Sequence, residues 1–219
     1  MNYEELTAEA NLAFSSNDFS RALDSAKKAI QMSPHNKEAY VIAGKIAMSM
    51  ENLDSAIEYF QSALALDKSN GNILFLLAYA QAYNGDSISA LRNLTRALEN
   101  HCDDGTRGQI YKMIVIINSD QNDFDNALIN LKQAEDYIGV DYEILQQKTA
   151  CYANLHDYHQ TIFVLNQMKL LSPKEYKAYS LTFNILYDEA KAELERAEKF
   201  ANLTMAYYIL SSIAKYPKV

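Results

Sequence analysis

Side chains that can bind a metal ion occur together at one place in this 219-residue chain, in the run His101–Cys102–Asp103–Asp104. Imidazole, thiolate and carboxylate groups are the usual protein ligands of zinc. A zinc site, however, usually draws its ligands from two clusters at characteristic spacings, and no second cluster accompanies this run. The run is therefore interpreted as part of a solvated loop, and the sequence predicts no metal site and no cofactor.

A second group of residues could exchange protons, because His156, Asp157 and His159 would suit an acid–base pair. The simpler interpretation is that Asp157 belongs to a short turn, since acidic residues recur in the same rhythm at Asp18, Asp86 and Asp123. No nucleophile adjacent to a base is found in the sequence. Gly105 and Gly108 lack the lysine that follows the glycines of a phosphate-binding loop. The sequence therefore predicts a protein that is not an enzyme.

The composition is that of a soluble folded protein, with 49% hydrophobic and 22% charged residues. The net charge of −8 argues against a nucleic-acid partner, because phosphate binding needs clustered lysine and arginine. Cys102 and Cys151 form no spacing motif and indicate free thiols in a reducing compartment. Residues 1–6 contain no basic or apolar segment, so we expect no signal peptide, no membrane span and a cytoplasmic location.

The elements that would position these side chains repeat every 34 residues. Small residues mark the period, with one step of 37 residues before the fourth unit: Ala22, Ala56, Ala90, Ala127 and Thr161, and Ala29, Ala63, Ala97, Ala134 and Met168. A fixed period of this length indicates a solenoid, in which each unit buries its apolar face against its neighbours. The chain has only 6 glycines and 3 prolines, too few for the turns of a β-sandwich or barrel, so the units are expected to be helical.

Each unit is expected to be a helical hairpin, most clearly in residues 37–70. The apolar residues of the first half fall on one helix face, and those of the second half fall on one face of another helix. Glu51–Asp54 forms the polar turn between them, with Asp54 as the expected N-cap of the second helix. Gly44 and Ala56 are expected where the two helices cross, because only small side chains allow close approach there.

These hairpins resemble the tetratricopeptide repeat (TPR) family, best in the stretch from Ala43–Gly44 to Ala63–Leu64. The resemblance covers residues 3–175 and implies an all-α, right-handed superhelical solenoid of antiparallel helix pairs. Five hairpins are expected, at 3–36, 37–70, 71–104, 108–141 and 142–175. The chain departs from the family pattern in lacking tryptophan, in having Thr161 for the usual alanine, and in having Lys68 and Cys102 where proline is common.

Two stretches break the period. Residues 101–108 hold three extra residues, and their two glycines and two aspartates predict a looser joint at which the superhelix bends. At Leu186–Tyr187 five residues that should end one helix and form the next turn are missing. Either two helices fuse there or the sequence omits a short segment. We therefore expect a shortened sixth repeat at 176–204 and a capping helix at 205–219.

The resemblance also implies that the first helix of each hairpin lines a concave, ligand-binding surface. The residues at the corresponding positions are Asn11, Phe14, Val41, Lys45, Met48, Phe75, Tyr79, Tyr83, Lys112, Ile116, Gln146, Asn154 and Asn184. Phe75, Tyr79 and Tyr83 are four residues apart and so form one stripe. Two interpretations stay open for the helix at 72–84: it is buried on all sides, or it exposes an aromatic groove suited to anchoring a ligand.

The leading hypothesis is a non-enzymatic scaffold that binds a protein segment, as an amphipathic helix or an extended peptide, in this groove. Some TPR proteins clamp a terminal carboxylate between lysine and asparagine side chains on successive first helices. Here Lys45 stands alone, so the clamp is incomplete and binding of chaperone tails is not predicted. The rival hypothesis is a structural module that forms homo-oligomers through its final helix or the ends of the array.

Overall fold

The structure is a computed structural model that describes residues 1–172 and residue 188. The described residues form ten α-helices and no β-strand. The helices are α1 (Tyr3–Ser15), α2 (Phe19–Met32), α3 (Lys37–Ser49), α4 (Leu53–Leu66), α5 (Gly71–Tyr83), α6 (Ser87–Glu99), α7 (Asp104–Asp120), α8 (Phe124–Ile138), α9 (Tyr142–Asn154) and α10 (Tyr158–Leu171). The predicted sixth repeat, its irregularity at Leu186–Tyr187 and the predicted capping helix lie, apart from Asp188, outside the described residues.

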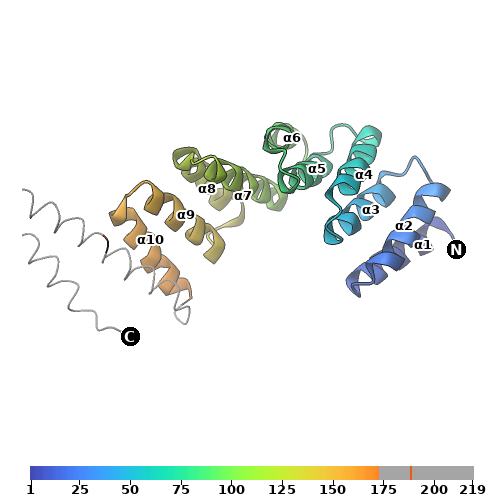
Figure 1. The fold of residues 1–219 in the computed structure, drawn as a ribbon, viewed down its shortest axis with the longest axis horizontal. Helices are drawn as coiled ribbons and strands as arrows, with labels where there is room; N and C mark the ends of the chain where they lie inside the picture. Colours follow the sequence, from blue (N-terminus) through green and yellow to red (C-terminus); the bar gives the residue numbers. More distant parts are fainter. Residues whose placement is uncertain (173–187, 189–219) are drawn as a thin grey trace, which may run out of the picture.

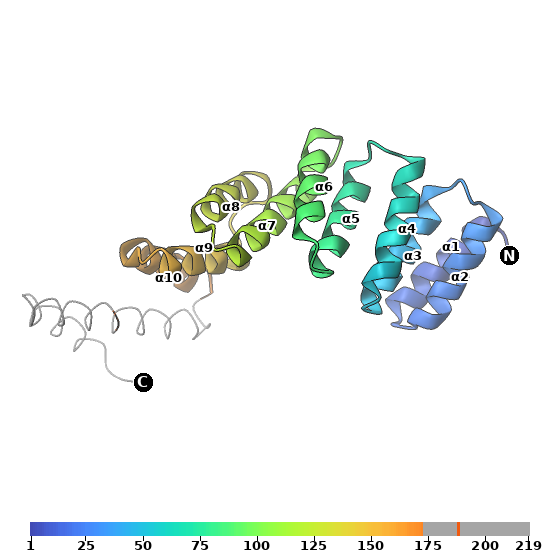
Figure 2. The same cartoon turned by 45° about the horizontal axis from the view of Figure 1, so that its top comes forward.

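The helices pair in chain order, and the hairpins stack one after another from the N-terminus (Figures 1 and 2). Each helix contacts the next one, and α1 also contacts α3, as α5 contacts α7. The prediction of an all-α solenoid of antiparallel helix pairs is therefore confirmed.

The core is a series of small clusters along the array, each shared by neighbouring hairpins. The alanines that mark the period are the most buried residues: Ala22, Ala29, Ala56, Ala63, Ala90, Ala97, Ala127 and Ala134 are all 0% exposed. Thr161 occupies the same place in the fifth hairpin, where its hydroxyl donates a hydrogen bond to the Asp157 carbonyl at 2.7 Å. The polar group of this departure from alanine is thus satisfied within the helix.

The turn inside every hairpin has the same two-residue design. Its first residue has a left-handed backbone, with φ between 57° and 84° in Asn17, Glu51, Gly85, Asn122 and His156. The following residue is the N-cap of the second helix and accepts a hydrogen bond from the backbone N–H three residues on: Asp18, Asn52, Asp86, Asp123 and Asp157. The expectation that Asp54 is the N-cap of α4 is wrong, because Asn52 holds that place and Asp54 accepts a hydrogen bond from Asn84 Nδ2 at 3.1 Å.

The left-handed turn position gives a first prediction. Glu51→Gly should raise the free energy of unfolding by about 0.5–1 kcal/mol, because glutamate has φ of 59° there and a Cβ atom disfavours that backbone. Gly85→Ala is the matched control and should lower stability, since Gly85 has φ of 84°. Urea titrations of both variants check this. A destabilised Glu51→Gly would mean that the Glu51 side chain, and not its backbone, stabilises the turn.

The caps also make stability depend on pH. Hydrogen bonds from the Ser89 backbone and side chain lower the pKa of Asp86 below its ordinary value of 3.8. A carboxyl whose pKa is lower in the folded chain stabilises the fold above its unfolded pKa, and this stability is lost as pH falls through the folded pKa. Asp86→Asn keeps a capping oxygen, as Asn52 does in the second hairpin, but does not titrate. The loss of stability in acid should be smaller in Asp86→Asn, measured as melting temperature from pH 5 to pH 2.

The expectation of a loose joint at residues 101–108 is wrong. Residues from Asp104 onward form the first turn of α7, which has 17 residues where α5 has 13. Asp103 caps this turn, accepting hydrogen bonds from the Thr106 backbone and hydroxyl at 2.8 Å each. Gly108 lies so close to Ile138 that an added Cβ atom would be 2.3 Å from its Cγ2. The extra residues therefore lengthen a helix, and the glycine serves close helix packing.

The array nevertheless changes direction at this point. In Figure 2, helices α3–α6 stand upright, whereas α9 and α10 lie across that direction, with α7 between. The contact between α6 and α7 is the smallest of those between consecutive described helices. The bend predicted here therefore agrees with the arrangement of the helices, although its cause is a longer helix.

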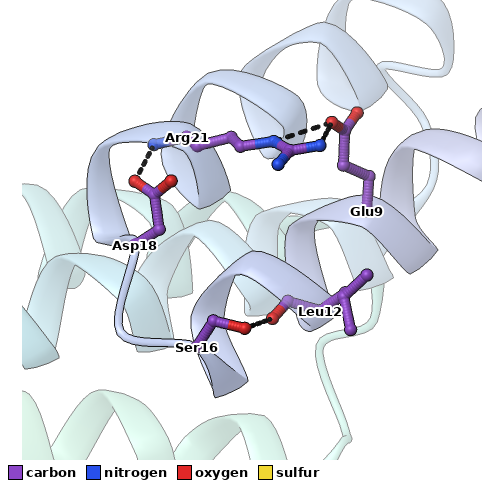
Figure 3. A network of polar contacts seen from close by, with 5 residues as sticks. All are labelled: Glu9, Leu12, Ser16, Asp18 and Arg21. Carbon is purple, nitrogen blue, oxygen red and sulfur yellow. Dashed lines mark hydrogen bonds and ion pairs between the residues drawn. The ribbon is translucent and has the colours of Figure 1, made fainter.

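The outer face of α1 is polar, unlike the same face of the other first helices. Its Glu9 accepts two hydrogen bonds from the Arg21 guanidinium of α2, at 2.6 and 3.0 Å (Figure 3). Leu12 is 69% exposed on this face, whereas the equivalent residues Ile46, Ala80, Ile117 and Cys151 are at most 2% exposed because the preceding hairpin covers them. A solenoid needs such a polar surface where its first hairpin meets solvent.

Candidate functional site

The predicted aromatic series lies on α5, at the middle of the described array. The Asn70 side chain caps this helix by accepting a hydrogen bond from the Ile73 N–H at 3.1 Å. One face of α5 is held by the core, where Leu74 and Ala78 are 0% exposed and pack with residues of α6 and α7. Phe75 and Tyr79 are half-buried against the same cluster, whereas Tyr83 is 59% exposed. The helix is thus neither buried on all sides nor aromatic on a fully exposed face.

The three rings contact one another along the helix. The ring centroids of Phe75 and Tyr79 are 6.1 Å apart in an edge-on arrangement, and those of Tyr79 and Tyr83 are 4.6 Å apart and stacked. A hydrogen bond with Tyr83, followed by burial, raises the pKa of Tyr79 to about 12. Both phenols are therefore neutral at physiological pH, and the rings form one continuous aromatic ridge, which we call the α5 ridge (Phe75, Tyr79, Tyr83).

The apolar residues predicted beside the ridge are only partly accessible. Val41 and Ile116 are half-buried. Met48 packs against the cluster around Ala56 and Phe60. Phe14 contacts the Phe19 ring at 5.8 Å and helps to cover the first core cluster. These side chains therefore stabilise the hairpins, and each offers a ligand only part of its surface.

The two predicted lysines have different surroundings. The Lys112 side chain is 12% exposed, and its ammonium pairs with Glu143 and, at 3.7 Å, with Asp141. Both acids lie at the start of α9, so this lysine links two hairpins and its charge is already neutralised. The sequence analysis missed these partners, although acids about one period after a lysine could have indicated them. Lys45 is exposed on α3, and the described residues offer it no ion pair.

The predicted amide residues are spread along the surface and do not converge. Asn11, Gln146 and Asn154 are exposed on α1 and α9. The Asn154 amide donates a hydrogen bond to the Ala150 carbonyl of its own helix at 2.8 Å. Asn184 lies outside the described residues.

A buried polar pair behind the ridge was not predicted. Gln81 and Asn93 are 8% and 7% exposed, and the Asn93 amide donates a hydrogen bond to Gln81 Oε1 at 2.7 Å. Arg96 donates in turn to Asn93 Oδ1 at 3.0 Å. The only sequence signal is that two amides occupy the apolar stripes of α5 and α6. Their hydrogen bonds fix the pairing of these two helices behind the ridge.

The residues suggestive of metal or acid–base chemistry have structural roles. Cys102 is buried with its thiol 3.6 Å from the Ala97 carbonyl, while Asp103 caps α7. Burial raises the pKa of the Cys102 thiol, and it does the same for Cys151, so both are protonated at neutral pH. His156 occupies a left-handed turn position and Asp157 caps α10. Within the described ranges, no three His, Cys, Asp or Glu side chains are placed to hold a metal ion.

Two shallow depressions lie away from the ridge. One, of about 420 Å³, is lined by His35, Asn36, Lys37, Leu66 and Asp67. The other, of about 470 Å³, is lined by Met1, Leu6, Lys28, Gln31 and Met32. Neither contains a predicted site residue, and neither combines an apolar interior with convergent polar groups. Among the described helices, none has the length and apolar character needed to cross a membrane.

Comparison with known proteins gives a family and a fold. The family model described as tetratricopeptide repeat matches residues 7–72. No curated protein matches the sequence.

Similar solved structures include MamA, at 16% identity, TM-score 0.68 and coverage of 80% of this chain and 94% of that one. YrrB, a TPR protein with an unusual peptide-binding site, has 21% identity, TM-score 0.63 and coverage of 80% and 89%. PilF of Pseudomonas aeruginosa has 12% identity, TM-score 0.73 and coverage of 99% and 93%. At these identities the likeness concerns the fold.

Proposed function

We propose, for a chain that belongs to the tetratricopeptide repeat family, that the α5 ridge binds a peptide or helix of a partner protein. The family consists in general of non-catalytic scaffolds for protein–protein interaction. The proposal adds that this chain is such a scaffold, has no catalytic activity of its own, and has its binding site on the surface formed by α1, α3, α5, α7 and α9.

The observation that carries the proposal is the graded burial of the three rings. Phe75 and Tyr79 are fixed against the core, while Tyr83 is 59% exposed and stacks on Tyr79. Rings fixed before binding lose little conformational entropy when a ligand packs on them, and so make effective anchors. The peptide-binding site of the structurally similar YrrB is in keeping with this function.

A selection experiment tests the proposal. A random peptide library displayed on phage is selected on the full chain and, in parallel, on the double variant Tyr79→Ala/Tyr83→Ala. We expect peptides that bind the wild type and fail to bind the double variant, provided that circular dichroism shows the variant to be folded. If both proteins select the same peptides with the same affinity, the binding site lies elsewhere.

Binding to the ridge should depend only weakly on salt. Of the two predicted lysines, Lys112 is neutralised by Glu143 and Asp141, which leaves Lys45 as the exposed charge beside the ridge. We expect the Kd of a selected uncharged peptide to change by less than about threefold between 50 and 300 mM NaCl, because screening acts on exposed charges. Calorimetric titration measures this. A tenfold loss of affinity would point to an ionic site.

A further inference from the structure

The outward face of the second helices changes character along the array. One exposed position of these helices, repeated with the period of the hairpins, carries charge in the first three hairpins and a large apolar side chain in the last two. Its residues are Asp24, Glu58, Arg92, Ile129 and Phe163. Ile129 and Phe163 are each 60% exposed, although an exposed apolar side chain at this position does nothing for the hairpin core.

On α10 a second large apolar side chain lies on the same face. Leu170 is 82% exposed and follows Phe163 by seven residues, or two helical turns. The equivalent position in the other hairpins holds Gln31, Ala65, Glu99 and Asp136. Between Phe163 and Leu170 the exposed residues on this face are Asn166 and Gln167, and His159 precedes them. This outer α10 face (His159, Phe163, Asn166, Gln167, Leu170) therefore carries no carboxylate, lysine or arginine.

We propose that the outer α10 face is the contact between two copies of this chain, packed about a two-fold axis. In an antiparallel pair of α10 helices, Phe163 of each copy meets Leu170 of the other, because the two residues are equally far from the helix midpoint at Asn166–Gln167. Such self-complementarity is what a two-fold contact requires. Ile129, at the Phe163-equivalent position of α8, extends the apolar surface on either side.

The charge distribution favours a second copy at this face. Two chains of net charge −8 repel each other, and burying an unpaired charge in their contact would add a desolvation penalty. The outward faces of α2, α4, α6 and α8 carry charged residues, as at Lys27, Glu58, Arg92 and Lys132. The outer α10 face is the one where two copies can bury apolar area without desolvating a charge.

Disulfide trapping tests this contact in the full chain. Gln167→Cys places a thiol next to the two-fold axis, and we expect mild oxidation to link it to its counterpart in a second copy. Ser62→Cys is the matched control, because Ser62 is exposed at the equivalent position of α4 and should not cross-link. Cys102 and Cys151 are buried and contribute little background.

Sedimentation velocity over a concentration series measures the association directly. We expect the wild type to approach the mass of a dimer, and Phe163→Glu to raise the dimer Kd at least about 30-fold, since it introduces a charge on both sides of the contact. The fold should tolerate this change, because Glu58 occupies the equivalent position in the second hairpin. Leu12→Gln, which alters an exposed leucine at the far end of the array, should leave the Kd unchanged.

Three outcomes would overturn the proposal. The first is a wild type that stays monomeric at all concentrations with no Gln167→Cys cross-link, as expected if later residues of the same chain cover the face. The second is a dimer that Phe163→Glu leaves intact. The third is equal cross-linking of Gln167→Cys and Ser62→Cys.

Discussion

Replacing Tyr79 with alanine is expected to weaken the binding of a selected peptide by roughly 2 kcal/mol or more, about a 30-fold rise in Kd. Tyr79 is the middle ring of the α5 ridge and contacts both Phe75, at 6.1 Å, and Tyr83, at 4.6 Å between centroids. Its loss removes one anchor and also frees the exposed Tyr83 ring to change rotamer. Calorimetric titration of wild type and variant with the same peptide measures the effect.

Two further variants separate the role of the ring from general damage. Tyr79→Phe keeps the ring and removes the hydroxyl, so most of the affinity should remain if the ring is the anchor. Tyr137→Ala is a matched truncation on α8, where Tyr137 is 37% exposed and stacks on Tyr111 at 5.8 Å. It should leave the affinity unchanged. If Tyr79→Ala is folded and binds as tightly as the wild type, the α5 ridge is not the site.

Phe60→Ala is expected to lower the free energy of unfolding by about 3–5 kcal/mol, the largest effect predicted for a single residue of this chain. Phe60 is 0% exposed and fills the space between α3, α4 and α5, among Ala47, Ala56, Leu77 and Ala80. These alanines cannot extend into the cavity left by the ring, so little of the lost packing can be recovered. Chemical denaturation followed by circular dichroism measures the difference.

Gly44 supplies a double-mutant cycle for the same site. A Cβ atom added at Gly44 would lie 2.5 Å from Phe60 Cε1, so Gly44→Ala alone should lower stability by about 1–3 kcal/mol through overpacking. In the Phe60→Ala background the ring is gone, and the same change should be neutral or stabilising, because alanine favours helix over glycine by about 1 kcal/mol. Equal effects in the two backgrounds would show that Gly44 and Phe60 do not share this contact.

Features that depend on local spacing were predictable from the residues. The 34-residue period identified the buried alanines and the helical hairpins, because each hairpin repeats the same contacts with its neighbours. The recurring acid or amide at the turns marked the true N-caps, whereas the single-hairpin argument for Asp54 was wrong. The loop predicted from the glycines and aspartates at 101–108 was also wrong, since Asp103 caps a longer helix and Gly108 packs against Ile138.

The candidate site was predictable only in part. The spacing of Phe75, Tyr79 and Tyr83 correctly placed three rings on one stripe of α5, but their burial depends on how much of each ring α6 and α7 cover. Lys112 could not be classified from its own surroundings in the chain, because the acids that neutralise it belong to the next hairpin. The proposed contact at Phe163 and Leu170 became visible only when equivalent positions could be compared for exposure.

The sequence by itself determined the class of the fold, the hairpin units and the residues of the repeating core, because these follow from short-range periodicity and side-chain size. Only the tertiary structure decided which periodic side chains remain accessible, which charges are already paired, and where the array turns. Those properties arise between hairpins, from residues about 30 positions apart that meet when the units stack, as Lys112 meets Glu143 across 31 positions. A one-dimensional period predicts that neighbouring units touch, and the shape of each contact depends on side chains drawn from both units.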